Sequence, residues 1–190
     1  MKQKNKAFTL TEMAIVISII AILLGIAIPN IISMKKKAEV DRAINILASL
    51  LRETYDKTNQ ALLSDGYYIE IIVNNNKVQQ INFIDFTDGT KKVVKTFDVN
   101  NLVIKIYEND TQLLPTSNYK VIYLTYTKYG ILYGTFANNA FNDVTSIIST
   151  SLTSKINYYS NKDIKIELAY SDKKKTLIMP IASPGRVEIK

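Results

Sequence analysis

The chain has 190 residues, with 24 Lys and Arg against 17 Asp and Glu, and a formal net charge of +7. It contains neither Cys nor His. Disulfide bonds and thiol chemistry are therefore excluded, and so are the commonest general base and the commonest metal ligand of proteins. The length fits one domain better than two.

An apolar run dominates the start of the chain. From Met13 to Ile28 no side chain is charged, and Ser18 is the only polar one. Counted from Phe8 the segment has about 21 residues, and at ~1.5 Å per residue a helix of that length spans the ~30 Å hydrocarbon core of a bilayer. One carboxylate, Glu12, lies within it. A lone acid costs about 3 kcal/mol in a membrane, so Glu12 needs a partner.

Six features meet in this segment: a leader with Lys2, Lys4 and Lys6, the small residue Ala7, Phe8, the pair Thr9-Leu10, Glu12, and the long apolar run closed by Pro29. Together they resemble the class III signal and N-terminal helix of type IV prepilins and type II secretion pseudopilins. Two residues depart from the family pattern. Ala7 stands where Gly is commoner, and Thr11 stands where an aliphatic residue is usual.

The resemblance implies a maturation and an assembly step. In that family prepilin peptidase cuts on the cytoplasmic side, here between Ala7 and Phe8, and then N-methylates the new terminus at Phe8. Glu12 takes the position of the family's assembly glutamate, with the Phe8 amine of its own chain or of a neighbouring subunit as its partner. The leader would lie inside and the bulk of the chain outside the bacterial inner membrane.

Two simpler interpretations of the apolar run remain open, an ordinary secretory signal peptide and a plain single-span anchor. Gly25-Ile26-Ala27 could serve as the cleavage site of a signal peptide. The run is too long for such a peptide, however, and Glu12 would have no role there. Orientation is not settled by charge, because Lys35-Lys36-Lys37 follow the run much as three lysines precede it.

Beyond Pro29 the periodicity of an amphipathic helix appears. Its apolar positions recur every three or four residues, at Val40, Ile44, Leu47, Leu51, Tyr55 and Leu62, and the opposite face carries Asp41, Arg42, Asn45, Glu53 and Lys57. Pro29 removes a backbone donor and is expected to kink the helix or loosen the turn before it. The helix should end near Ser64-Asp65-Gly66, with Gly66 as a left-handed cap.

The rest of the chain has the alternation and turn residues of strands. Strands are expected at residues 67–73, 77–84, 92–99, 102–108, 119–126, 131–136, 164–170, 176–182 and 186–189. Asn74-Asn75-Asn76 predicts a hairpin turn, and Asn100-Asn101 is expected to separate two strands.

These elements predict an α+β fold, in which a long N-terminal helix packs on an antiparallel sheet. Four segments follow: a leader at 1–7, a membrane or filament-core helix half at 8–29, an amphipathic half at 30–65 and a β-rich extracytoplasmic domain at 66–190. The ending Ile181-Ala182-Ser183-Pro184-Gly185-Arg186-Val187 resembles the closing strand of minor pseudopilins of the GspH/FimT type.

Two further kinds of site can be weighed. Asp85, Asp88 and Gly89, and likewise Asn138, Asn139, Asn142 and Asp143, hint at calcium, but neither stretch has the spaced oxygen ligands that calcium requires, and turn chemistry explains both. We expect no metal and no cofactor. Lys173, Lys174, Lys175 and Arg186 could contact DNA phosphates, with Tyr158 and Tyr159 available to stack on bases. DNA-binding relatives of the FimT type carry Gly-Arg-x-Arg here, whereas Glu188 replaces the second Arg.

The sequence thus predicts a structural protein rather than an enzyme: a minor pilin or pseudopilin of a type II secretion or type IV pilus filament. Its partners would be other pilin-like subunits, met through the N-terminal helix, together with the prepilin peptidase and the inner membrane. The alternative is a minor pilin that acts as a DNA receptor in competence for natural transformation.

Overall fold

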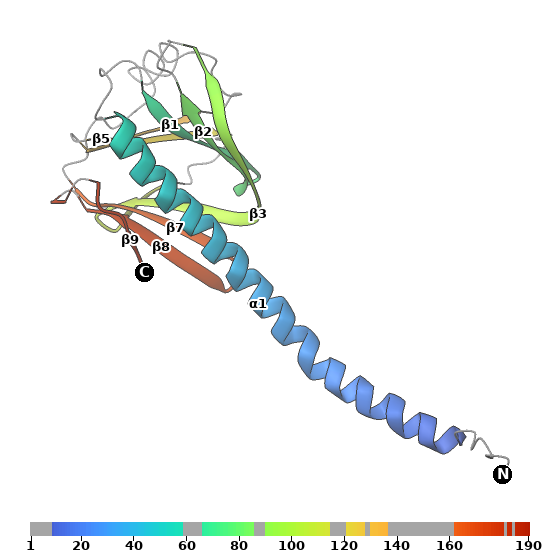
Figure 1. Ribbon diagram of the computed structural model, residues 1–190. Helices are drawn as coiled ribbons and strands as arrows, with labels where there is room; N and C mark the ends of the chain where they lie inside the picture. The colour runs from blue at the N-terminus through green and yellow to red at the C-terminus, as the bar shows by residue number, and fades with distance from the viewer. Residues whose placement is uncertain are drawn as a thin grey trace.

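The computed structural model describes residues 9–58, 66–85, 90–114, 121–127, 130–136, 162–180, 182, 183 and 185–190. Within them one helix, α1 (Leu10–Thr58), precedes nine strands. These are β1 (Tyr67–Asn74), β2 (Lys77–Asp85), β3 (Lys92–Glu108), β4 (Thr111–Leu114), β5 (Val121–Thr127), β6 (Gly130–Phe136), β7 (Ile164–Tyr170), β8 (Lys173–Met179) and β9 (Glu188–Ile189). The predicted α+β architecture is confirmed. Figure 1 shows the second half of α1 lying on the strands and its first half extending away from them.

The 49 residues of α1 form one continuous helix with Pro29 inside it. Proline leaves one carbonyl of the preceding turn without its usual amide donor, yet helical structure continues on both sides. The kink predicted at Pro29 remains a prediction, whereas the predicted continuity of the helix through this residue is confirmed.

The second half of α1 packs on the sheet through the face that its periodicity predicts. Val40, Ile44, Leu47 and Leu51 are at most 1% exposed, and Tyr55 lies partly buried against the same core. Leu62 falls outside the described residues. This face makes most of its contacts with β5, β8, β7 and β1. The helix therefore packs on strands from both ends of the sheet, β5 and β1 near one end and β7 and β8 near the other.

The described strands form one antiparallel sheet in the order β6-β5-β1-β2-β3-β7-β8-β9, with β4 paired to β3. Its first hairpin turns at Asn75 and Asn76, whose φ angles are +50° and +60°. Two consecutive positive φ angles define the tight turn that matches the twist of paired strands, and Asn tolerates them. The turn predicted at this position is confirmed.

The prediction of two strands separated by Asn100-Asn101 is wrong. The structure has a single 17-residue strand, β3, with Asn101 at a φ of +66°. Between the pairs Val78–Leu102 and Gln80–Asp98 the register shifts, so the extra residues of β3 form a bulge. Bulges bend a strand without ending it. The first part of β3 therefore pairs with β2 and its last part with β7, and the strand curves from one half of the sheet to the other (Figure 1).

The left-handed cap expected at Gly66 is wrong, because Gly66 does not have a positive φ. The helix is described as far as Thr58, and the end predicted near Ser64-Asp65 lies outside the described residues. A Cβ placed on Gly66 would lie 3.5 Å from Cγ2 of Thr58, so the chain returns to the end of the described helix before it enters β1. Smaller differences are found at the C-terminus, where β8 covers Lys173–Met179 rather than the expected residues 176–182.

Both faces of the central strands are buried. The face that carries Ile69, Ile71 and Phe83 belongs to the core beneath α1. Because side chains alternate along a strand, their neighbours Tyr68 and Glu70 point to the opposite face, and both are also buried. A polar cluster around Glu70 lies on that second face.

Candidate functional site: the start of the helix

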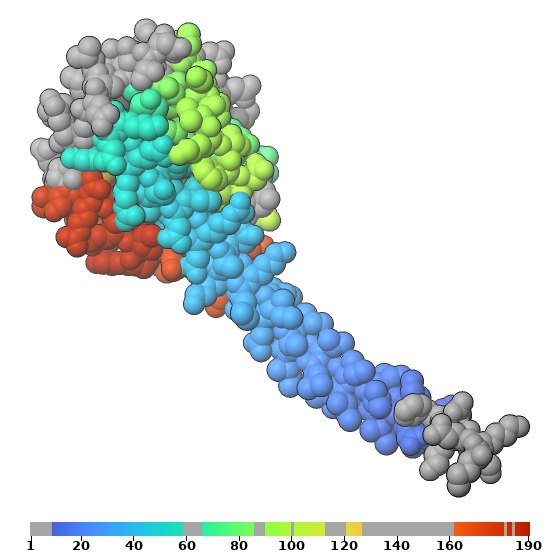
Figure 2. All heavy atoms as spheres, viewed as in Figure 1, coloured from blue at the N-terminus to red at the C-terminus, as the bar shows by residue number. Residues whose placement is uncertain are grey.

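The first half of α1 is a rod of exposed apolar side chains. From Leu10 to Met34 its large hydrophobic residues are between 46% and 88% exposed, and a Cβ added to Gly25 would meet open space. Figure 2 shows this half standing clear of the domain. Water does not stabilise such a surface, which needs lipid or other apolar helices around it. Within the described residues α1 is the one helix long and apolar enough to cross a membrane.

The polar groups within this rod bond locally. The Ser18 hydroxyl donates to the carbonyl of Ala14 at 2.8 Å, one turn earlier. This bond satisfies the hydroxyl inside the helix itself, as a helix in lipid requires. Thr11, which departs from the pattern of the resembled family, lies in the first turn of α1.

Glu12 closes the first turn through a reciprocal pair with Thr9. The backbone N–H of Thr9 donates to Glu12 Oε2 at 2.8 Å, and the Thr9 hydroxyl donates to the same oxygen at 2.7 Å. In return, the backbone N–H of Glu12 donates to the Thr9 hydroxyl oxygen at 3.2 Å. This is a capping box, which satisfies amide donors that the first turn of a helix otherwise leaves free. The spacing Thr-x-x-Glu at residues 9–12 is the signature of this box, and it is the signal from which the box could have been predicted.

The capping role of Glu12 can be separated from its predicted role in assembly. Gln can replace Glu in such a box, since only an acceptor oxygen is needed at that position. A partner amine, by contrast, requires the negative charge. Ala7 and Phe8, the predicted cleavage and methylation residues, lie outside the described residues, as does the predicted pairing of Glu12 with the Phe8 amine.

Two contacts fix the second half of α1 to the C-terminal segment, and a third joins it to β5. Arg52 Nη2 donates to the carbonyl of Val187 at 2.9 Å. Gly185 has a φ of +86°, and a Cβ there would lie 2.6 Å from the ring of Tyr55. That ring packs against Tyr126, with a centroid distance of 5.3 Å. Gly185 and Val187, which belong to the segment that resembles a closing pseudopilin strand, thus contact the helix.

A further ion-pair group joins α1 to β3. Glu53 contacts Lys95 at 2.7 Å and Lys57 at 3.2 Å. Burial favours the neutral carboxyl of Glu53, but the hydrogen bonds and charges of these two lysines prevail and lower its pKa below the usual value. These contacts orient the domain on the helix.

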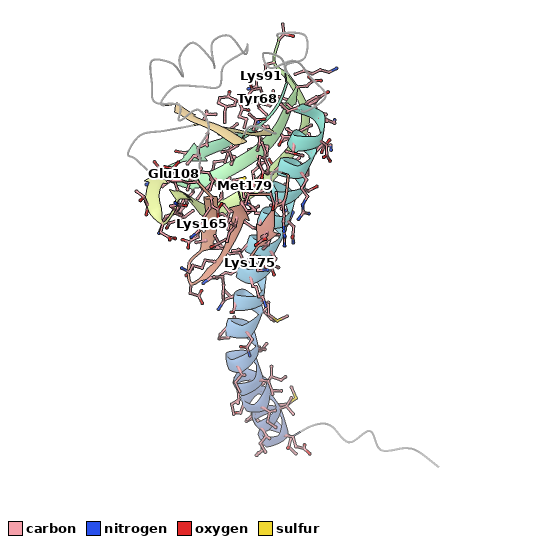
Figure 3. All side chains as sticks on the ribbon, turned by 90° about the vertical axis from the view of Figure 1, so that its left-hand side faces the viewer. Tyr68, Lys91, Glu108, Lys165, Lys175 and Met179 are labelled. Carbon is pink, nitrogen blue, oxygen red and sulfur yellow. The ribbon has the colours of Figure 1, made fainter. Side chains whose placement is uncertain are left out.

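Each basic residue proposed for DNA contact has a carboxylate partner. Lys173 pairs with Asp172 at 2.7 Å, Lys174 with Glu167 at 3.2 Å, Lys175 with Asp41 at 2.7 Å and Arg186 with Glu188 at 3.0 Å. The Lys173 contact lowers the pKa of Asp172. Lys175 thus contacts α1 through Asp41, and Figure 3 shows Lys175 beside the helix. Tyr158 and Tyr159 lie outside the described residues. The arrangement presents mixed charges rather than a continuous basic surface.

The described residues contain no group of three or more His, Cys, Asp or Glu side chains placed to hold a metal ion. Of the residues weighed for calcium, Asp85 is described, and it lies opposite Lys92 in the β2–β3 ladder at the end of β2. Asp88, Gly89, Asn138, Asn139, Asn142 and Asp143 lie outside the described residues.

Residues 2–28 match the model of the prokaryotic N-terminal methylation motif. Comparison with curated proteins gave no match, and comparison with solved structures gave none either. The matched residues contain the leader, Glu12 and most of the exposed apolar rod, the part of the chain to which the geometry also points. The N-terminal segment of this chain therefore resembles that of a type IV prepilin or pseudopilin-like protein.

Proposed function

We propose that the chain is a minor pilin or pseudopilin, a structural subunit of a type II secretion or type IV pilus filament. One observation supports this role most directly: a single carboxylate, Glu12, lies in the first turn of an otherwise uncharged and exposed helix half. An anchor alone would gain nothing from that charge, since it costs about 3 kcal/mol in lipid. A subunit that must align with its neighbours has a use for it.

The assembly step follows from the capping box. Thr9 supplies two donors to one oxygen of Glu12, which lowers the cost of holding the carboxylate in the membrane before assembly. No bond among the described residues occupies Oε1, which can therefore accept from a cation. In a filament, the Phe8 amine of a neighbouring subunit would approach it, and the charge pair would fix the axial register of the two helices.

The other predicted features accord with this role. Prepilin peptidase would cut between Ala7 and Phe8 and methylate the new terminus in the inner membrane. The domain would then lie on the extracytoplasmic side, with α1 holding it at the filament surface. A pilin-type segment indicates a structural subunit rather than an enzyme. The alternative role as a DNA receptor has less support, because the four basic candidates are paired with carboxylates.

The test compares Glu12→Gln with Glu39→Gln, a matched change farther along the same helix. The amide of the Glu12→Gln variant keeps the capping box and loses only the charge, so the helix start and membrane insertion should be preserved. We expect recovery of Glu12→Gln subunits in sheared filaments to fall at least tenfold, and that of Glu39→Gln to stay near wild type. Glu12→Asp should be intermediate, because its shorter side chain reaches less far.

Mass spectrometry of the same membranes supplies the control for processing. Both variants should begin at methylated Phe8, which shows that the peptidase step is intact. Glu12→Gln subunits at wild-type levels in filaments would contradict the charge-pair mechanism. A mature chain that begins at Ile28 would contradict the pilin role altogether, in favour of a signal peptide.

A further inference from the structure

The polar cluster on the second face of the sheet brings three reactive groups together. Glu70, on β1, is 1% exposed. Its Oε1 accepts hydrogen bonds from Lys91 Nζ and from the Tyr123 hydroxyl, both at 2.6 Å. Its Oε2 accepts one from Asn82 Nδ2 at 2.9 Å, and the same Nδ2 lies 3.5 Å from Gln80 Oε1. One carboxyl group thus touches an amine and a carboxamide.

These groups are shielded from water. The side chain of Lys91 is 14% exposed, Asn82 is 5% exposed and Tyr123 is 2% exposed. Figure 3 shows Lys91 near Tyr68, at the end of the sheet farthest from the free half of α1. Low exposure to water strengthens polar interactions and slows competing hydrolysis.

One atom of the cluster is not satisfied. Asn82 Oδ1 is buried, and no donor reaches it among the described residues. Buried amide oxygens nearly always accept a hydrogen bond, so this one requires an explanation. A half-turn of the amide would exchange its two ends and bring Oδ1 against Glu70 Oε2. A proton on the Glu70 carboxyl would then join the two oxygens, and the Lys91 ammonium, which contacts the same carboxyl at Oε1, can supply it.

We propose that Lys91 and Asn82 join in an intramolecular isopeptide bond, with Glu70 as the residue that transfers the proton. Oε1 accepts from Lys91 and Tyr123, and Oε2 accepts from Asn82 Nδ2. After the half-turn of the amide, Oε2 is the oxygen that faces Oδ1 and passes a proton to it. The contacts therefore assign a nucleophile, an electrophile and an acid to three different side chains. Preorganised groups of this kind react far faster than the same groups free in solution.

The step balances in atoms and charge. Lys91 transfers a proton to Glu70, and its neutral Nζ attacks Cγ of Asn82. The proton on Glu70 passes to Oδ1 as the tetrahedral centre forms. The tetrahedral centre collapses as the bond from Cγ to Nδ2 breaks. One proton from Nζ and one from the hydroxyl at Oδ1 pass to Nδ2, which leaves as ammonium. The products are a secondary amide and an ionised Glu70, and the step consumes no oxidant or reductant.

Mass spectrometry of the purified full-length chain in detergent tests the proposal. The folded protein should be lighter than its sequence by one molecule of ammonia. Trypsin does not cut after an acylated lysine, so residues 78–92 should appear as one internally closed peptide, without fragment ions from breaks between residues 82 and 91. Unmodified protein should instead give the open peptide 78–91.

Variants separate this reaction from loss of ammonia elsewhere. Lys91→Arg keeps the ion pair with Glu70 but cannot form the bond, whereas Lys92→Arg changes the neighbouring lysine and leaves the cluster intact. We expect full mass for Lys91→Arg and for Glu70→Gln, and the lighter mass for Lys92→Arg. Cooperative thermal unfolding of each variant shows that it is folded. Wild-type protein that is folded and has its full mass overturns the proposal, as does ammonia loss that persists in Lys91→Arg.

Discussion

At the scale of single residues, two carboxylates, Glu12 and Glu70, differ in where their partners lie along the chain. Glu12 stands out in the sequence because it is the one charge in an apolar run. Its bonds to Thr9 were equally encoded, through the spacing of a capping box. Glu70 carried no such signal, because its partners come from three separate parts of the chain. Burial of a charge depends on tertiary contacts that a local pattern does not contain.

The glycines show the same limit. The sequence analysis assigned the left-handed conformation to Gly66, because Gly commonly ends helices. The structure places it at Gly185 instead, where the chain turns under the ring of Tyr55. Only the packing of the C-terminal segment on α1 creates that requirement.

Replacing each glycine by alanine tests this assignment. Gly185→Ala should lower the free energy of unfolding by about 2 kcal/mol, since Ala in the left-handed region costs about 1–2 kcal/mol and its Cβ would also displace Tyr55. Gly66→Ala is the matched control, with ordinary contact at 3.5 Å, and should change stability by less than about 0.5 kcal/mol or increase it. Denaturant unfolding of both variants measures the difference. Equal effects would refute the strained position of residue 185.

At the scale of elements, periodicity predicted the helix and most of the strands. The stripe from Val40 to Leu51 identified the buried face of α1, and the alternation at residues 164–170 matches β7. The continuity of β3 was missed because Asn100-Asn101 is equally typical of a turn and of a bulge. What decides between them is the pairing of residues 103–108 with β7, which lies far along the chain.

The hairpin between β1 and β2 allows a test of local turn chemistry. Asn76 has a φ of +60°, so Asn76→Gly should stabilise the domain by about 0.5–1 kcal/mol. Asn74→Gly, the matched change two residues earlier, lies in the ladder opposite Lys77 and should destabilise it by roughly 0.5–1 kcal/mol. Thermal unfolding of the two variants should move in opposite directions. A shift in the same direction would mean that the turn is not the one described.

At the scale of the whole molecule, α1 serves two environments. Its exposed large hydrophobic side chains end at Met34, and its core residues begin at Val40, with Lys35-Lys36-Lys37 between them. The lysines mark the border between the helix half with exposed apolar side chains and the half that covers the sheet. The first half therefore contributes nothing to the core of the domain, and the second half is part of it.

This division predicts that the chain without residues 1–34 folds on its own. A protein that begins at Lys35 keeps Val40, Ile44 and Leu47 in the core and loses the apolar rod, so it should be a soluble monomer. We expect circular dichroism of a mixed helix and sheet, and one cooperative thermal transition. The control begins at Ser49 and lacks those three core residues. Because each buried aliphatic side chain contributes about 1.5–3 kcal/mol, their loss would remove most of the roughly 5–15 kcal/mol that a domain of this kind possesses. The shorter chain should aggregate or lose its cooperative transition. If the chain from Lys35 is itself insoluble, or helical without sheet, then the border between anchor and domain does not lie at the lysines.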